Sequence, residues 1–593
     1  MARLRVSLAR SLLVCMVAMA LASLFASRNS TLKLVDWLLS VLASFDGVAE
    51  FNAREPNYVS GNWAPVHVEH LNAECAMSGK LPSSLAGGVY VRTGPNSQCW
   101  PPSAKHHAFS GEAMLHRIHL DQHSAKYSNH WIRHPAFNES EVPGSPCPPS
   151  VGLGDMAMGG LALPRVLISR LRTHLAPSSV LPTPPTERMR PGGTAVIHHA
   201  GHLFAATELF QPFEISIELT AASGKWGEIV PRGFVDFEGM LSNQTAEGPF
   251  SDTLPFYGPF SAHPRIDPKT GELFFFAKNG IGGKPVPFVA FGKLSSEGKP
   301  LTHFQIPVGN PPPAFVHDMF LTPTYAIVID SSLRTDPARL ATGKGLYFWN
   351  ASAPLRFGII RRSATSAAEV LWVESSEAGH IWHAVSAWEE EADKLVLFAP
   401  VFGSYADEVP IHLPTEPPSF LTRFDIDLGT GSVTQRRISS QVVERPSVNP
   451  RVVAPTVVWL RSEGSSSREM GKEIVKFDLR TERVLGSFGC GSDCTFGEAI
   501  FVPRDGSGTD GAGDDGSSED AGYLMDIVYR ARDGASEYMV WDAQTMDREP
   551  LVRVTLPQRV PYGVHGLWLD QTVLQSLRPI SNIAWPVGSE SAA

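Results

Sequence analysis

The chain has 593 residues, enough for one very large domain or for two or three domains of ordinary size. Its composition, 43% hydrophobic and 19% charged residues, is that of a globular protein and excludes a disordered chain. A formal net charge of −10 without a long basic stretch excludes the positive surface that nucleic-acid binding requires, so we expect no nucleic-acid partner.

The first 50 residues predict two apolar elements in tandem. Three arginines precede an apolar stretch over residues 12–26, so residues 1–30 are typical of a signal peptide, a transit segment or a short signal-anchor. Apolar residues then recur at near-helical spacing over residues 31–50, which predicts an amphipathic helix. Such a helix either packs on the body of the protein or lies in a membrane interface, and the apolar stretch before it favours membrane contact.

Residues 51–593 predict a single all-β domain. Short β-rich runs separated by Gly, Pro, Asp and Asn recur along the chain, and no long helical pattern interrupts them. Examples are GELFFF at 271–276, YAIVID at 325–330, KLVLFA at 394–399 and GYLMDIVY at 522–529. So many short strands favour a β-propeller over a sandwich, because radial repetition buries each blade against its neighbours.

Two segments predict insertions on this body. Residues 143–191 contain a Gly-rich run and a Pro-rich run, and we expect them to hold a short helix and loops above one face. Residues 505–520, DGSGTDGAGDDGSSED, are too polar to bury and are expected to form a disordered, solvated hairpin tip. The spacing of their acidic residues fits no EF-hand loop, so we expect no calcium site there.

The cysteines predict a body built for reducing conditions. Six cysteines in so long a chain are too few and too scattered for a disulfide framework. The one close pair, Cys490 and Cys494, has neither a second cysteine pair nor a neighbouring histidine to complete a zinc site. We therefore expect these two residues to remain loop thiols.

Four of the 20 histidines lie in apolar surroundings next to predicted strands and are spread over the whole body. They are His263 in FSAHPRIDP, His317 in FVHDMFLT, His383 in IWHAVSAWEE and His565 in PYGVHGLWL. Taken singly, each is typical of a hydrogen-bonded core histidine. In a propeller, however, the inner strands converge on the axis, so the four can meet in a metal site. Imidazole ligands suit iron, copper, nickel and zinc alike.

Buried carboxylates are expected near such a site, because a metal-bound histidine usually donates its second N–H to a carboxylate. Three glutamates have apolar or constrained neighbours: Glu208 in LFAATELF, Glu444 in VVERPSVNP and Glu498 in FGEAIFVPR. A glutamate is more often a surface residue, but these neighbours favour burial. We expect the three to support the histidines.

With these residues in place, the chain resembles the carotenoid cleavage oxygenases, especially their plant-type, epoxycarotenoid-cleaving branch. The resemblance runs from about residue 62 to the C-terminal region. It is carried by GVYVRTGPN at 88–96, HAFSGEAMLH at 107–116, GGTAVIHHAGHLFAATE at 192–208, SAHPRIDPKTGELFFF at 261–276, FVHDMFLT, RFGII, KFDL at 476–479 and LPQRVPYGVHG at 556–566. It implies a seven-bladed propeller, an axial Fe(II) held by the four histidines, and three supporting glutamates.

The resemblance also implies a reaction. Oxygen adds across a C=C bond of a carotenoid or apocarotenoid, such as a 9-cis-epoxycarotenoid, and the bond breaks into aldehyde or ketone products. No general acid or base is assigned beyond the metal site. We expect a monomer that draws its substrate from a membrane, in a plastid or another membrane-bounded compartment, with a secretory signal-anchor left open.

Five positions depart from the family pattern: Thr93, Ser110, Ala113, Ser386 and Val564. None is a candidate ligand. Three alternatives stay open: isomerisation or ester cleavage of a retinoid on the same fold, cleavage of a stilbene-type phenolic compound, and, from another class, a carotenoid-binding protein without catalysis. The altered motifs motivate the last alternative, whereas the intact histidines and glutamates favour an enzyme.

Overall fold

The computed structural model describes residues 28–577 apart from residues 55–56, 135–136, 138–141, 176–191, 209, 218–227, 242–256, 280–287, 309–311, 406–416, 463–470 and 505–517. The apolar stretch of the predicted leader lies outside these described residues, as does most of the predicted polar loop at 505–520. None of the helices in the described ranges combines the length and the apolar character that crossing a bilayer needs.

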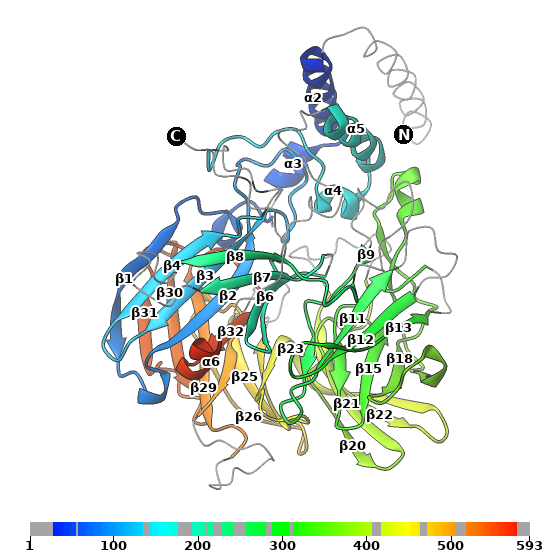
Figure 1. Ribbon diagram of the computed structural model, residues 1–593, viewed down its shortest axis with the longest axis vertical. Helices are drawn as coiled ribbons and strands as arrows, with labels where there is room; N and C mark the ends of the chain where they lie inside the picture. The colour runs from blue at the N-terminus through cyan, green and yellow to red at the C-terminus, as the bar shows by residue number, and fades with distance from the viewer. Residues whose placement is uncertain are drawn as a thin grey trace.

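The strands form a β-propeller of seven antiparallel blades, as the sequence predicts (Figure 1). Strand β1 is shared by the first and last blades and β23 by the fifth and sixth, so these pairs of blades merge into longer sheets. Blade 1 contains β1 (His70–Gly79), β2 (Gly88–Asn96), β3 (Glu112–Leu120), β4 (Ala125–Trp131) and β32 (Gly566–Leu569). Blade 2 contains β5 (Ala195–His199), β6 (His202–Ala206), β7 (Phe213–Ile217) and β8 (Ile229–Phe234).

The next two blades come from the middle of the chain. Blade 3 contains β9 (Tyr257–Gly258), β10 (Arg265–Ile266), β11 (Leu273–Asn279), β12 (Phe288–Leu294) and β13 (Pro300–Pro307). Blade 4 contains β14 (Met319–Leu321), β15 (Tyr325–Asp330), β18 (Arg356–Arg361) and β19 (Val370–Glu374). Between β15 and β18 the chain makes a separate hairpin of β16 (Leu333–Thr335) and β17 (Tyr347–Trp349).

The last three blades complete the ring. Blade 5 contains β20 (Ser386–Glu391), β21 (Lys394–Phe402), β22 (Ser419–Asp427) and the first part of β23 (Ser432–Val448). Blade 6 contains the second part of β23, β24 (Val457–Ser462), β25 (Glu473–Asp478) and β26 (Arg483–Gly489). Blade 7 contains β27 (Cys494–Thr495), β28 (Ile500–Pro503), β29 (Gly522–Arg530), β30 (Ala535–Asp542) and β31 (Val552–Thr555).

Apolar side chains between adjacent blades make the core. All six residues of β15 are buried, because its blade is covered on both faces. Between blades 4 and 5, the rings of Phe357 and Phe424 meet edge to face with centroids 5.0 Å apart. Because both faces of each blade are buried, its strands are continuous apolar runs. Such runs are visible in the sequence, so the strands could be predicted from it.

The end of the chain closes the propeller. Strand β32 pairs with β2, with Arg92 opposite Gly566. A Cβ on Gly566 would lie 2.5 Å from the hydroxyl of Tyr90, so only glycine lets the two strands approach at this point. This pairing holds the residue before Gly566, His565, at the inner edge of blade 1.

Helices gather above one face of the propeller (Figure 1). They are α2 (Arg28–Phe45), α3 (Val48–Ala53), α4 (Leu153–Met158) and α5 (Ala162–Leu175), while α6 (Gln571–Ser576) follows β32. The predicted N-terminal amphipathic helix is thus α2, and the predicted insertion supplies α4 and α5. Val35, Leu39 and Leu42 of α2 pack against Ile168 of α5. Asp46 binds both Lys105 and Arg165, which fixes the end of α2 to this cap.

The prediction of free cysteines is wrong for four of the six. Cys99 and Cys147 form a disulfide with their Cα atoms 4.8 Å apart, and Cys490 and Cys494 form a second with a separation of 5.9 Å. The first pair is separated by 48 residues, and only the folding of the insertion back over the β2–β3 connection brings the two together. Cys75 is a free thiol.

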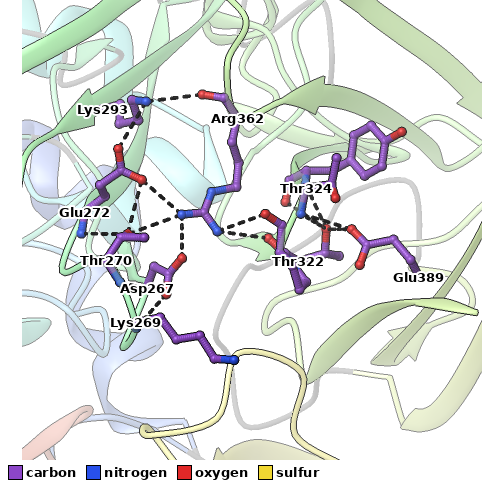
Figure 2. A network of polar contacts seen from close by, with 11 residues as sticks. Asp267, Lys269, Thr270, Glu272, Lys293, Thr322, Thr324, Arg362 and Glu389 are labelled. Atoms are coloured by element: carbon purple, nitrogen blue, oxygen red, sulfur yellow. Dashed lines mark hydrogen bonds and ion pairs between the residues drawn. The ribbon is translucent and has the colours of Figure 1, made fainter. Parts of the chain in front are cut away.

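A polar network links three consecutive blades (Figure 2). The guanidinium of Arg362, after β18, binds Asp267 at 2.5 Å and Glu272 at 3.0 Å in blade 3. In blade 4, Thr322 donates to the carboxylate of Glu389 in blade 5 at 2.6 Å. Burial alone would raise the pKa of the Asp267 carboxyl, but hydrogen bonds from the Lys269 amide and from Arg362 hold it below its usual value. The ion pair is therefore present at neutral pH and is lost only in acid.

We predict that Arg362→Met lowers the free energy of unfolding by about 3 kcal/mol, because it leaves the buried Asp267 without its cation. The midpoint of urea denaturation at pH 7 measures this loss. Arg361→Met is the matched control: the neighbouring side chain is exposed and lies over Tyr325, so its loss is expected to cost less than about 1 kcal/mol. Equal losses in the two variants would contradict the role of the network.

Candidate metal centre

The four predicted histidines meet at the centre of the propeller. Each lies one to three residues before an edge strand of its blade: His263 before β10, His317 before β14, His383 before β20 and His565 before β32. One nitrogen from each of His263, His317 and His383 lies within 4.8 Å of the others. The ring of His565 lies 4.4 Å from that of His263 and 5.3 Å from that of His383, measured between centroids. Residues up to 302 positions apart in the chain thus share one site.

The three predicted glutamates bind these histidines. Glu444 accepts from Nδ1 of His383 at 2.6 Å, Glu498 faces Nδ1 of His565 at 2.7 Å, and Glu208 faces Nδ1 of His317. Glu208 lies in blade 2, Glu444 in blade 6 and Glu498 beside blade 7. Each of the seven blades therefore supplies one of the seven residues.

These bonds fix the protonation of the imidazoles. A proton on Nδ1, held by the carboxylate, leaves the lone pair on Nε2 and turns it toward the centre. The Nε2 atoms of His317 and His383 lie only 3.3 Å apart. With both Nδ1 atoms protonated, neither Nε2 can donate a hydrogen bond to the other. Two lone pairs at this distance repel each other, and a cation bound by both would remove the repulsion.

Burial keeps two of the four histidines neutral. Burial and the nearby histidines hold the pKa of His263 well below its usual value of 6.5, and burial and the charge of Arg445 do the same for His383. The Nε2 atoms of His263 and His565 are buried and have no hydrogen-bond partner among the described residues. Nitrogen donors from four histidines, backed by three carboxylates, fit a divalent transition metal ion, whose charge the glutamates offset.

One side of the cluster is an apolar wall that the sequence alone did not reveal. The ring of Trp382 stands edge to face with that of His317, with centroids 4.8 Å apart, and its Nε1 donates to the hydroxyl of Tyr405 at 3.2 Å. Phe315 packs on Trp382 at 5.3 Å, and Met156 of α4 belongs to the same apolar cluster. Trp382 precedes His383 directly, and that adjacency was the only sequence signal for it.

Two of the five positions that depart from the family pattern, Thr93 and Ser386, bind backbone carbonyls. Thr93 donates its hydroxyl to the carbonyl of Gly192 at 3.0 Å, and Ser386 donates to the carbonyl of Pro455 at 2.6 Å. The side chain of Val564 is buried beside His565 in the chain. None of these departures removes a candidate ligand.

Comparison with known proteins agrees with this geometry. Residues 63–570 match the family model described as retinal pigment epithelial membrane protein, which covers most of the chain. The chain belongs to this family. A carotenoid 9,10(9',10')-cleavage dioxygenase of Arabidopsis thaliana is 28% identical to it over 536 residues, covering 88% of this chain and 91% of that protein. A chloroplastic 9-cis-epoxycarotenoid dioxygenase of rice (Oryza sativa subsp. japonica) is also 28% identical, covering 88% of this chain and 76% of that protein.

Solved structures share the fold. The lignostilbene dioxygenase of Pseudomonas brassicacearum superposes with a TM-score of 0.66 at 22% identity, covering 87% of this chain and 99% of that one. The apocarotenoid oxygenase of Synechocystis, in a Glu150Gln mutant, superposes with a TM-score of 0.65 at 22% identity, covering 85% and 97%. These two structures share the propeller fold with this chain, and the relatives named above are dioxygenases, which are oxidoreductases.

We predict that the metal-free protein loses stability as the pH falls below 6.5. Below this pH His263 and His383 bind protons in the unfolded chain but stay neutral in the folded one. Each therefore lowers the free energy of unfolding by about 1.4 kcal/mol per pH unit until its folded pKa is reached. Urea denaturation between pH 8 and pH 5 measures the slope. His263→Gln should flatten it, while His123→Gln at an exposed site should leave it unchanged. Identical slopes in all three proteins would refute this assignment.

Proposed function

We propose that this protein is an Fe(II)-dependent dioxygenase that cleaves a C=C bond of a carotenoid or apocarotenoid into aldehyde or ketone products. A 9-cis-epoxycarotenoid is a candidate substrate, because a 9-cis-epoxycarotenoid dioxygenase is among the relatives. The observation that carries the proposal is the convergence of four imidazole rings, three of them oriented by glutamates, beside an apolar wall.

His263, His317, His383 and His565 are the proposed ligands, with Glu208, Glu444 and Glu498 as the residues that orient them. Iron is the metal that the resemblance implies, and the neutral nitrogen donor set suits it. A solved structure with the same fold is of a cobalt-substituted Synechocystis protein, which supports a metal in this chain as well. Bound Fe(II) supplies the redox chemistry with which O2 is activated.

The chain's own residues then have distinct tasks. The glutamates hold each Nδ1–H, so that the Nε2 lone pairs stay directed at the centre without rearrangement. Trp382, Phe315 and Tyr347 offer aromatic faces that exclude water and orient a conjugated chain next to the histidines. No carboxylic acid or base is needed, because cleavage adds both oxygen atoms without a net proton transfer.

We predict that the iron-reconstituted protein, supplied with a panel of carotenoids under air, yields aldehyde or ketone fragments detected by mass spectrometry. His317→Ala should abolish iron binding and turnover, and Glu444→Gln should lower iron affinity or activity roughly 10–100-fold. Glu390→Gln, at an exposed position, is the control and should behave as the unmodified protein.

If no aldehyde or ketone fragment is formed from any carotenoid, the dioxygenase proposal is wrong. A geometric isomer or a free retinol would identify the isomerase or esterase alternative, and cleavage of stilbenes alone would identify the phenolic one. Binding of the polyene without turnover would identify a carotenoid-binding protein. Full activity in His317→Ala would refute the metal assignment.

We also propose that the protein acts as a monomer at a membrane surface, in a plastid. Relatives from rice and Arabidopsis thaliana are named chloroplastic, and the two disulfides favour a compartment in which thiols can be oxidised. Leu34, Trp37 and Phe45 lie on one face of α2 and are 37%, 58% and 71% exposed. A membrane interface would cover this face beside a substrate that dissolves in lipid.

We predict that the double variant Trp37→Glu, Phe45→Glu reduces co-sedimentation with phosphatidylcholine–galactolipid vesicles at least ten-fold. This is roughly the loss expected when two aromatic side chains that insert into the interface are replaced by charged ones. The matched control is Val484→Glu, Leu485→Glu, which alters two similarly exposed apolar residues on β26. An equal effect of both double variants, or none, would count against α2 as the membrane contact.

A further inference from the structure

A β-bulge redirects one side chain toward the metal centre. The pairing of β23 with β24 shifts register between Glu444 and Pro446, which leaves Arg445 as the extra residue. Its φ of 57° is in the left-handed region that non-glycine residues rarely adopt, and its amide donates to the carboxylate of Glu444. Bulges occur next to active sites because they change the direction of a side chain.

The consequence is that two consecutive side chains reach the same histidine. In a regular strand, Glu444 and Arg445 would face opposite sides. Here Glu444 binds Nδ1 of His383, while Nη1 of Arg445 lies 3.5 Å from Nε2 of the same ring. Since Nε2 faces the four-histidine centre, the guanidinium stands at its edge.

The guanidinium of Arg445 has no ion pair of its own in the described part of the chain. Its two acidic neighbours, Glu444 and Glu498, are each bound to a histidine, and no carboxylate lies within ion-pair distance of Arg445 in the described ranges. Arg461 adds a second positive charge nearby and donates to the hydroxyl of Tyr562 and to the carbonyl of Gly497. The guanidinium of Arg445 is therefore free to bind an anion.

We propose that Arg445 forms an oxyanion subsite of this centre, which takes the carboxylate of a conjugated polyene acid. The inference rests on the proposed function and narrows its substrate class. A guanidinium next to a divalent ion is repelled by it, and an oxyanion between them removes that repulsion while accepting charge-assisted hydrogen bonds. The apolar wall of Phe315, Tyr347 and Trp382 takes the polyene. The bond that is cleaved then lies close to the acidic end.

Equilibrium binding tests the subsite without turnover. All-trans-retinoic acid and all-trans-retinol, which share the polyene and differ in the polar end, are titrated into Fe(II)-loaded protein without oxygen and into metal-free protein. Quenching of tryptophan fluorescence reports binding. We expect the acid to bind at least ten-fold more tightly than the alcohol, about the effect of one hydrogen bond to a charged group.

Variants at the bulge assign the preference to one residue. Arg445→Gln removes the charge and should bring the ratio of the two affinities to about one. Arg445→Asn, whose residue type tolerates the left-handed backbone, should do the same if the glutamine variant misfolds. Arg445→Lys should retain a preference for the acid. Arg436→Gln, exposed on the same strand, is the control and should leave the ratio unchanged.

Equal affinities of the unmodified protein for the acid and the alcohol would overturn the subsite, and so would a preference that persists in both neutral variants. Failure of the proposed function is a separate result: the acid preference would still appear in the metal-free protein, while no carotenoid in the panel would be cleaved.

Discussion

The hydrogen bond between a buried glutamate and the Nδ1–H of an axial histidine is the interaction on which this site depends. It appears at His317, His383 and His565, and in each case it turns Nε2 toward the centre. Burial also keeps His263 and His383 neutral, so their nitrogens are available as donors. The propeller serves this interaction because each of its seven blades delivers one of the seven residues to the axis.

The two sides of the centre differ in chemistry. Trp382, held by Tyr405, and Phe315 form an aromatic surface, whereas the bulge at Arg445 presents a cation on the histidine ring nearest to it. A conjugated hydrocarbon matches the first side and an oxygen anion the second. The centre is therefore amphipathic. Its polar side results from the bulge in β23, which lies where this strand passes from one blade to the next.

The helical cap connects this centre to the surface of the protein. Helix α4 contributes Met156 to the apolar wall, and α5 joins α4 to α2, whose outer face carries Trp37 and Phe45. The disulfide between Cys99 and Cys147 attaches the start of the insertion to the connection after β2. The same cap thus lines the site with one end and exposes apolar side chains with the other.

The sequence by itself determined the all-β class, the candidate ligands and their glutamates, because buried strands need apolar runs and polar residues within such runs need a chemical reason. The strand over residues 325–330 and the surroundings of His317 and Glu444 are examples. Tertiary structure alone decided the pairing of Cys99 with Cys147 and the direction of Arg445. Both depend on how distant segments fold back or shift register, and neither leaves a periodic trace in the chain.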